Sequence, residues 1–352
     1  MIMVKYYTRV CNFYLGKISK EKVKKKTALA LNNNKSISFD TIEVITRKNK
    51  KIIHIKEVKN QSSKILQKIK KDIKIVTKKK FFKGLNFSNI PILMGVVNLT
   101  PDSFSDGGKY NKKNLGFLHA KLLVKQGCKI LDIGGESTRP GAKDINKIIE
   151  WKRINKTLKK IKKLKRLVSL DTRKSWVMEK GIKNRINIIN DVSGLSYDKN
   201  TIDILKKYNV PFIIHHMLGT PKNMQKNPKY KNVLLDIYDF FEEKIKEIRS
   251  HGIKHNNIIL DPGIGFGKNL KHNMTIMSNI SIFHSLGFPV MLGVSRKRFI
   301  KDVSGINDSN ERLGGTISSG LYAMNQGVQI LRVHDVNEVN QAIKVFEYLN
   351  FK

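Results

Sequence analysis

The sequence has few of the residues that mark several large classes of protein. Two cysteines, Cys11 and Cys128, occur in 352 residues, which is too few for a disulfide framework. No stretch approaches the roughly 18 uninterrupted apolar residues that a membrane-spanning helix needs. Lys5 and Arg9 interrupt the apolar N-terminus, which argues against a secretory signal peptide. These absences favour a cytoplasmic protein with reduced thiols and no membrane partner.

Acidic residues are also scarce. The chain has 28 Asp and Glu against 68 Lys and Arg, so its formal net charge is +40. A charge of this size is typical of proteins that bind nucleic acid. The excess, however, is nearly all lysine, extends along the whole chain and accompanies many Asn and Ile residues, as in genomes rich in A/T codons. We therefore expect no nucleic-acid partner, although the positive field favours anionic substrates.

The composition of the chain changes near residue 90. Proline is absent and glycine is rare before this point. The alternating segments ISFDTIEVI (37–45) and KKIIHIKEV (50–58) predict two strands joined by a turn, and residues 62–80 predict a basic amphipathic helix. We therefore predict a small α+β extension over residues 1–85, whose role the sequence does not reveal, and a second domain over residues 86–352.

The second domain alternates short apolar runs with helix-like segments. The runs lie at 92–97, 129–133, 167–171, 186–191, 211–216, 257–261, 289–294 and 329–335. The helix-like segments after the first and fifth runs end at glycine, the expected helix stop. Eight strand–helix units in about 260 residues are the signature of a (β/α)8 TIM barrel. A doubly wound α/β sheet, which usually has fewer strands, is the alternative.

A polar residue stands at or just after the end of each apolar run. These residues are Asn98, Asp132, Asp171, Asn190, His215, Asp261, Ser295 and His334. One polar residue at a strand end is usually a turn former or a helix cap. Eight of them indicate a shared site, because the carboxyl ends of barrel strands converge on the face where active sites lie.

Long strings in the second domain resemble, in a fixed order, the signatures of the dihydropteroate synthase family. The resemblance covers about residues 91–350. The strings are MGVVNLTPDSFSDGG (94–108), LDIGGESTRPGA (131–142), SLDTRKS (169–175), IINDVSGL (188–195), HHMLGTPKNMQ (215–225), LDPGIGFGK (260–268), GVSRKRF (293–299) and RVHDV (332–336). The resemblance implies a pterin-binding barrel enzyme of folate biosynthesis. Such a transferase condenses (7,8-dihydropterin-6-yl)methyl diphosphate with p-aminobenzoate, giving 7,8-dihydropteroate and diphosphate by an SN1-like route.

The resemblance also implies which residues bind the pterin diphosphate. Asp171, Asn190 and Asp261 are expected to accept hydrogen bonds from the edge of the ring, with Asp132 in the same pocket. The residues expected around the ring are Lys297 at its carbonyl and N5, Met217 and Phe266 at its faces, and Gly293, which leaves room for it. The groups expected to hold the diphosphate are Thr138, Arg139, Arg332 and His334, with Mg²⁺ on the amide oxygen of Asn98.

The p-aminobenzoate pocket is expected on two loops, 98–111 and 134–146, which fold over the site and exclude water. Its residues, by resemblance, are Phe104, Ser137, Thr138, Arg139 and Pro140. The catalytic residues are expected to be Arg139, Lys297, Arg332 and His334. Arg298 departs from the family pattern, because a small hydroxyl residue often stands after the lysine. Competition by sulfonamides at the p-aminobenzoate pocket and a homodimer are further expectations from the family.

Other interpretations of single features stay open at this point. Arg332 and His334 can instead form a strand-end salt bridge with Asp335. The glycines of GIGFGKN (263–269), which does not match a Walker A loop, either approach the pterin or form a tight turn. A pterin-dependent methyltransferase on the same barrel is a rival function, but it needs neither the two long loops nor cations for diphosphate.

Overall fold

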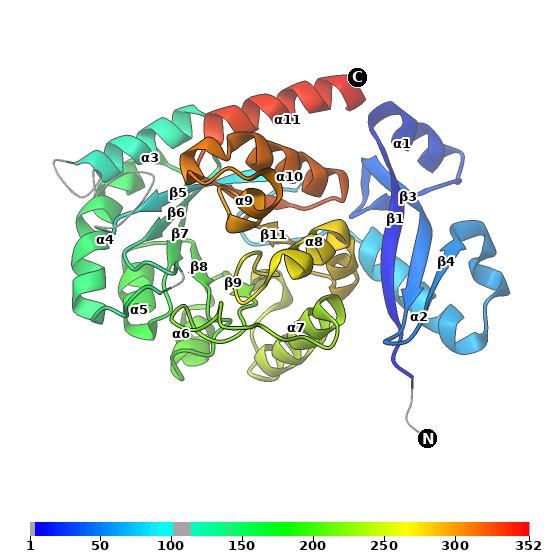
Figure 1. Cartoon of the computed structure of the whole chain (residues 1–352), viewed down its shortest axis with the longest axis horizontal. Helices are drawn as coiled ribbons and strands as arrows, with labels where there is room; N and C mark the ends of the chain where they lie inside the picture. Colours follow the sequence, from blue (N-terminus) through cyan, green and yellow to red (C-terminus); the bar gives the residue numbers. More distant parts are fainter. Residues whose placement is uncertain (1–3, 88, 101–113, 140, 352) are drawn as a thin grey trace.

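The chain folds into two sheets (Figure 1). The first is built from residues before the change in composition near residue 90, and the second from residues after it. The computed structural model describes residues 4–87, 89–100, 114–139 and 141–351. Within these ranges, a four-stranded antiparallel sheet is followed by an eight-stranded parallel sheet. None of the helices in these ranges is long and apolar enough to cross a membrane.

The eight-stranded sheet forms the predicted barrel. Its strands are β5 (Ile92–Asn98), β6 (Ile130–Gly134), β7 (Leu167–Asp171), β8 (Ile188–Asp191), β9 (Phe212–His215), β10 (Ile258–Asp261), β11 (Met291–Leu292) and β12 (Ile330–Val333). Neighbours pair in the order β10-β9-β8-β7-β6-β5-β12-β11. A parallel bridge between Leu260 and Val290 connects the two ends of this series. The (β/α)8 prediction is therefore confirmed.

Helices follow the strands and pack around the barrel (Figure 1). They are α3 (Leu115–Lys125), α4 (Lys147–Ile161), α5 (Ser175–Lys183), α6 (Thr201–Tyr208), α7 (Val233–Ser250), α8 (Leu270–Ser278), α9 (Arg298–Ser304), α10 (Leu313–Asn325) and α11 (Val336–Phe351). Their apolar faces and the outward side chains of the strands form one large buried cluster. This cluster holds the barrel together from outside, so the interior is left to two layers of inward side chains.

The interior layer nearer the amino ends of the barrel strands is apolar. It consists of Met94, Ile130, Ile188, Ile213, Ile259, Met291 and Ile330, and Phe82 and Phe87 pack against it from the segment before β5. Because side chains on a strand alternate between faces, the next inward position lies two residues later. On six of these strands that position is Asp132, Asn190, His215, Asp261, Gly293 or Arg332. An apolar floor thus supports a polar mouth at the carboxyl ends of the strands.

The N-terminal extension is α+β, as predicted. Its elements are β1 (Tyr7–Leu15), α1 (Gly16–Lys24), β2 (Leu29–Leu31), β3 (Asn34–Ile45), β4 (Lys50–His54), η1 (Ile55–Asn60) and α2 (Ser63–Thr77). β3 pairs with β1 along one edge and with β2 and then β4 along the other. The strand predicted over 50–58 is too long, because residues 55–60 form a 3-10 helix. β1 and α1 were not predicted from the sequence.

The extension packs directly on the barrel. Tyr7 is 1% exposed, and its ring meets the Tyr238 ring edge-on with 5.2 Å between centroids. Its hydroxyl donates a hydrogen bond of 2.9 Å to Asp239 Oδ1 on α7. Arg47 adds ion pairs to Asp236 and Asp239. The predicted boundary at residue 85 lies in the connection between α2 and β5 and stays a prediction.

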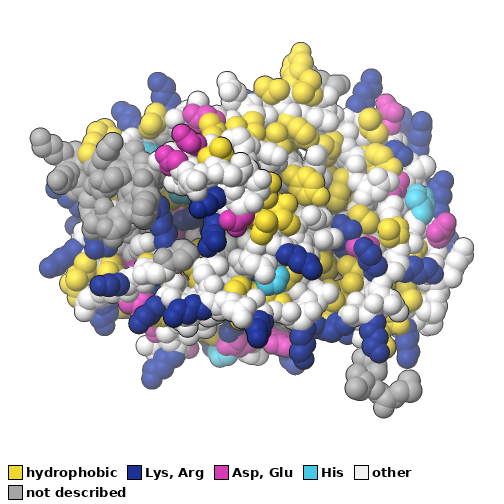
Figure 2. Space-filling model, viewed as in Figure 1, with side chains coloured by type: hydrophobic (Ala, Val, Ile, Leu, Met, Phe, Trp, Pro, Cys, Tyr) yellow, Lys and Arg dark blue, Asp and Glu magenta, His cyan; other side chains and the backbone are white. Residues whose placement is uncertain are grey.

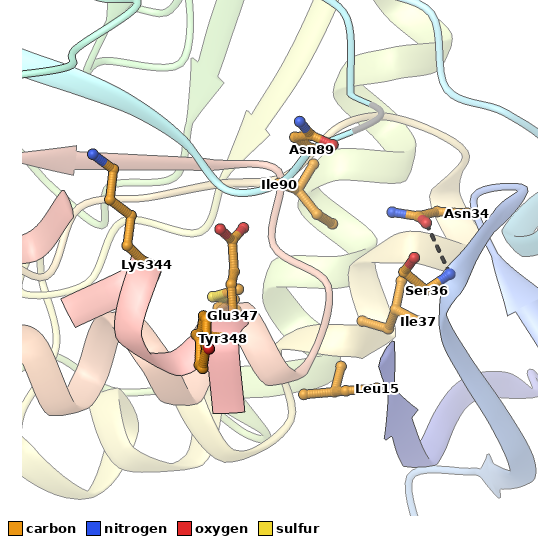
Figure 3. Close-up of a pocket in the computed structure, with 10 residues that line it drawn as sticks. Leu15, Asn34, Ser36, Ile37, Asn89, Ile90, Lys344, Glu347 and Tyr348 are labelled. Atoms are coloured by element: carbon orange, nitrogen blue, oxygen red, sulfur yellow. Dashed lines mark hydrogen bonds between the residues drawn. The ribbon is translucent and has the colours of Figure 1, made fainter. Parts of the chain in front are cut away.

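A cavity of about 350 Å³ lies between the extension and the barrel (Figure 3). Leu15 and Ile37 line it from the extension, Ile90 from the approach to β5, and Glu347 and Tyr348 from α11. None of the site residues predicted from the sequence lines this cavity. The functional site must therefore be sought at the mouth of the barrel.

The contact between Tyr7 and the barrel generates a prediction for stability. Tyr7→Ala should lower the free energy of unfolding by about 3 kcal/mol, since it removes a buried aromatic ring from a packed interface. Phe81→Ala, at a position 61% exposed in the connection between α2 and β5, is the matched control. Urea unfolding followed by circular dichroism measures both. Equal stability of the two variants would contradict the proposed packing of the extension on the barrel.

Candidate active site

Arg332 lies between two acids at the mouth of the barrel. Its Nε is 2.7 Å from Asp132 Oδ2, and its Nη2 is 3.0 Å from Asp171 Oδ2. The acids come from β6 and β7, while Arg332 comes from β12, on the other side of β5. Asn190 Nδ2 on β8 donates to the same oxygen of Asp132 at 3.2 Å. The barrel thus brings four of the predicted residues into one hydrogen-bonded group.

Burial raises the pKa of two acids at the mouth, Asp171 and Asp261. It raises the pKa of Asp171 to about 8, helped by the charge of Asp132 and opposed by Arg332. Burial also raises the pKa of Asp261 to about 6, although Gly263 N–H donates to its carboxylate at 2.8 Å. Both carboxyls therefore titrate near neutral pH, and a ligand that donates hydrogen bonds to them will favour their charged forms.

Several acceptor atoms at the mouth have no hydrogen-bond partner among the described residues. They are Asp132 Oδ1, Asp171 Oδ1 and Asn190 Oδ1, and all three are buried. A buried polar atom without a partner costs about 1–3 kcal/mol, so such atoms indicate a site that a ligand completes. A flat heterocycle with several N–H donors on one edge is the kind of ligand that this set of acceptors fits.

Lys297 and Phe266 lie together at the mouth. The Lys297 ammonium is 4.1 Å from the centre of the Phe266 ring, a cation–π contact. Burial and the charge of Arg332 lower the pKa of Lys297 to about 8. His215 meets Phe266 edge-on, with 4.5 Å between centroids, and its Nε2 lies 4.0 Å from Asp261 Oδ1. An aromatic face, a donor and a carboxylate are therefore close to one another.

His334 is held as a neutral imidazole. Burial and the charge of Arg332 lower its pKa well below the usual value. Its Nδ1 is 3.0 Å from Ser295 Oγ, which also accepts from the backbone N–H of His334. Asp335, the alternative partner considered for Arg332, is instead bound by Arg296 Nε at 3.0 Å. The alternative interpretation, a strand-end salt bridge between Arg332 and Asp335, is therefore wrong.

The segment after β6 carries Ser137, Thr138 and Arg139, all half-buried. The Arg139 backbone N–H donates to Ser137 Oγ at 3.5 Å, and the Arg139 charge helps to lower the pKa of Lys297 and His334. Arg139 therefore lies near the mouth. Phe104 and Pro140, which were predicted to belong to the same pocket, lie outside the described residues.

Three further residues predicted for the site, Gly293, Met217 and Asn98, lie at or just after the ends of strands. Gly293 follows β11, and a Cβ built there would meet only Arg332 Cβ, at 3.9 Å, so the glycine leaves open space. Met217 is half-buried two residues after β9, and Asn98 ends β5 beside Gly134. The described residues contain no group of three or more His, Cys, Asp or Glu able to hold a metal ion.

The glycines of GIGFGKN form a tight turn. Gly263 and Gly267 have φ of +70° and +64°, and Cβ atoms there would lie 2.0 Å from His216 O and 2.6 Å from Leu218 O. These two glycines are therefore required by the backbone that follows β9. Gly265 differs, because a Cβ there would meet Lys297 Cδ at 3.3 Å. Gly265 thus lies beside Lys297, while Gly263 donates its backbone N–H to Asp261.

Lys268, which sequence reasoning missed, supports this turn from within. It is 3% exposed, and its Nζ lies 2.9 Å from both Phe266 O and His216 Nδ1. Burial lowers its pKa well below the usual value. His216 thus contacts Lys268 and Phe240, while His215 contacts Phe266. The adjacent histidines therefore have different partners.

Positive charge is spread over the surface. Lys and Arg side chains are scattered across the visible face and its rim (Figure 2). The acids of the mouth, in contrast, are buried. The expectation that the chain has no nucleic-acid partner stays a prediction.

Comparison with known proteins identifies relatives across the whole barrel. The family described as pterin binding enzyme matches residues 94–334. A dihydropteroate synthase of Neisseria meningitidis serogroup C is 41% identical over 263 residues, which are 74% of this chain and 93% of the relative.

Solved structures agree. A Yersinia pestis dihydropteroate synthase with a sulfonamide drug complex superposes with a TM-score of 0.73 at 35% identity, covering 76% of this chain and 98% of that one. A Xanthomonas albilineans dihydropteroate synthase with 4-aminobenzoic acid gives 0.70 at 33% identity, covering 75% and 94%.

The shared guanidinium generates a prediction with a defined pH dependence. Arg332→Ala leaves two buried carboxyls without their cation, so it should destabilise the fold by about 3 kcal/mol at pH 8. The pKa of Asp171 is already raised, from 3.8 to about 8, and rises further without Arg332. The folded variant therefore binds more protons than the unfolded chain in this window, and its stability deficit should shrink as pH falls. Urea unfolding at pH 8 and pH 5 tests this, and a deficit equal at both would contradict it.

Proposed function

Since this chain belongs to the pterin binding enzyme family, and within it to the dihydropteroate synthases, we propose that it joins p-aminobenzoate to (7,8-dihydropterin-6-yl)methyl diphosphate. The products are 7,8-dihydropteroate and diphosphate. The chain is thus an enzyme that transfers a dihydropterinylmethyl group. The observation that carries the proposal is the set of unpaired acceptors on Asp132, Asp171 and Asn190 around Arg332. Cations beside these acceptors favour a diphosphate substrate over the pterin of a methyltransferase.

Recognition of the pterin follows from the acceptors. The aminopyrimidine edge of a pterin carries N–H donors, and Asp171, Asn190 and Asp261 supply oxygens for them, with Asp132 adjacent. Lys297 donates to the ring carbonyl and N5, while Phe266 and Met217 cover the faces of the ring. A heterocycle that lacks one of the donors leaves a buried acceptor unpaired, which costs about 1–3 kcal/mol.

The diphosphate is held by groups of the rim. Arg332 offers its planar guanidinium, which suits phosphate oxygens, and its two acids fix its orientation. His334, Arg139 and Thr138 add donors from β12 and from the segment after β6.

The amide oxygen of Asn98 fits Mg²⁺, which takes hard oxygen ligands and commonly keeps only one or two from the protein, the rest coming from phosphates and water. When bound, Mg²⁺ would neutralise charge on the diphosphate. Asn98 ends β5 at the same rim as Gly134, which supports this assignment.

The chemistry proceeds by loss of diphosphate before attack. The C–O bond breaks and its electron pair leaves with the diphosphate, which Arg332 and Arg139 stabilise. The electron-rich dihydropterin ring spreads the positive charge left on the methylene. The aromatic amine of p-aminobenzoate then forms the C–N bond, and the resulting acidic ammonium gives its proton to water or diphosphate. No strong general base is required.

The p-aminobenzoate pocket is proposed beside the rim, from Ser137, Thr138 and Arg139. Phe104 and Pro140 are further members by the family resemblance. The Xanthomonas albilineans structure holds 4-aminobenzoic acid and the Yersinia pestis structure a sulfonamide drug, and we propose that in this chain both kinds of ligand compete for this pocket. Arg298, which departs from the family pattern, has an exposed side chain 3.5 Å from Asp302.

A homodimer is a further part of the proposal. Apolar side chains stand exposed on the last two helices, Tyr322 on α10 and Val345 and Leu349 on α11. A second copy of the chain would cover them.

Turnover tests the function directly. The purified protein with both substrates and Mg²⁺ should release diphosphate and form dihydropteroate. Lys297→Ala should lower kcat/KM about a hundredfold, because it removes a buried donor from the pterin. Lys301→Ala, at an exposed position on α9, the helix that begins just after Lys297, should have little effect. Absence of diphosphate release by correctly folded protein would overturn the proposal.

Proton release tests how the pterin is recognised. Asp261, whose pKa is raised to about 6, is partly protonated at pH 6 and must become charged to accept two N–H donors. Pterin binding should therefore release protons, and affinity should fall as pH falls through 6. Calorimetry at pH 6 in buffers of different ionisation enthalpy measures this release, which Asp261→Asn should reduce. Binding by the wild type without proton exchange would contradict the assigned role.

A further inference from the structure

Both ends of the loop that carries Ser137, Thr138 and Arg139 reach one buried group of charges. At the first end, the Glu136 carboxylate accepts from Lys174 Nζ at 2.7 Å and from Arg173 Nη2 at 3.0 Å. The same carboxylate accepts from the backbone N–H of Ile145, at the second end, at 3.1 Å. A single side chain therefore ties the two ends of the loop together.

Arg173 makes a second connection across the loop. Its Nη2, which binds Glu136, is also 2.7 Å from Asp144 Oδ1. Its guanidinium lies over the Tyr197 ring, 4.3 Å from the centroid, so the plane of the fork is fixed. One guanidinium thus bridges acids at positions 136 and 144, which flank the described loop residues 137–139 and 141–143.

Lys174 connects this group of charges to helix α4. Besides Glu136, it binds Glu150 Oε2 on α4 at 2.8 Å, and Glu150 is fully buried. Arg173 and Lys174 follow Asp171 by two and three residues, so the chain that faces the pterin continues into these contacts. Arg153 adds a hydrogen bond of 2.9 Å to Gly135 O.

Stability alone is a weak reason for such a group. Buried ion pairs often contribute little net stability compared with well-packed apolar residues, because their desolvation is costly. Asp144, moreover, has a side chain that is 62% exposed and belongs to no core. What the group does achieve is geometric, since it fixes the separation of the two loop ends.

We propose that Arg173 and Lys174 are positioning residues that close the base of the loop through Glu136 and Asp144, and so hold Ser137, Thr138 and Arg139 in place for p-aminobenzoate. This inference rests on the proposed function. Neither positioning residue touches a substrate. Replacement of Arg173 or Lys174 should therefore raise the KM for p-aminobenzoate more than the KM for the pterin diphosphate. The pterin diphosphate keeps its proposed contacts with residues on the barrel strands.

Steady-state kinetics with each substrate varied in turn tests the proposal. Arg173→Met should raise the KM for p-aminobenzoate about tenfold, since it removes the charged hydrogen bonds to Glu136 and Asp144, and should change the KM for the pterin diphosphate less than about threefold. Arg173→Lys, which keeps the charge but not the fork, should give an intermediate value. Lys183→Met, which breaks an exposed ion pair with Glu179 on α5, is the matched control.

A second variant tests the proposal even if Arg173→Met fails to fold. Asp144→Asn alters an exposed side chain, so the fold should be retained, and the KM for p-aminobenzoate should rise about threefold. Thermal melting establishes that each variant is folded. An unchanged KM for p-aminobenzoate in folded Arg173→Met or Asp144→Asn, or equal rises for both substrates, would overturn the positioning role. Absence of turnover by the wild type would instead overturn the proposed function.

Discussion

The guanidinium of Arg332 between the carboxylates of Asp132 and Asp171 is the interaction on which the mouth of the barrel depends. Two buried acids repel each other and lose hydration, so they need a cation between them. That cation comes from β12, the last strand of the barrel domain, while the acids come from β6 and β7, its second and third strands, so the interaction spans β5. It also leaves one oxygen of each acid with no hydrogen-bond partner in the part of the chain that the structure describes, so that oxygen can bind a ligand.

The alternation of side chains along the strands places this group where it can act. Inward isoleucines and methionines form a closed floor, and on six of these strands the next inward position is polar or glycine. The floor excludes water from below, which strengthens every charge interaction at the mouth. The same exclusion explains why the acids are weak and Lys297 is easily deprotonated. A ligand with N–H donors on a neutral ring and an anionic tail can therefore bind the acids and the cations of the mouth at the same time.

The sequence predicts the barrel well because its strands are short apolar runs with polar ends. It predicts the mouth residues for the same reason, since Asp132, Asn190 and Asp261 each follow an inward isoleucine by two residues. It does not predict β1 and α1, whose apolar residues are interrupted by charges and are buried by distant partners, as Val10 is in the core of the extension and Tyr7 against the barrel. Nor does it predict the contacts of Glu136 with Arg173 and Lys174, because no local pattern reveals which distant charges a buried acid will meet. The tight approach of Gly263 to His216 is hidden for the same reason.

A crystal structure of the chain with a bound pterin tests the central claim most directly. The account predicts the ring above the apolar floor, with its N–H edge within hydrogen-bond distance of Asp171, Asn190 and Asp261, and with Lys297 at its carbonyl. A pterin bound elsewhere, or bound at the mouth with these three side chains still lacking ligand partners, would contradict it.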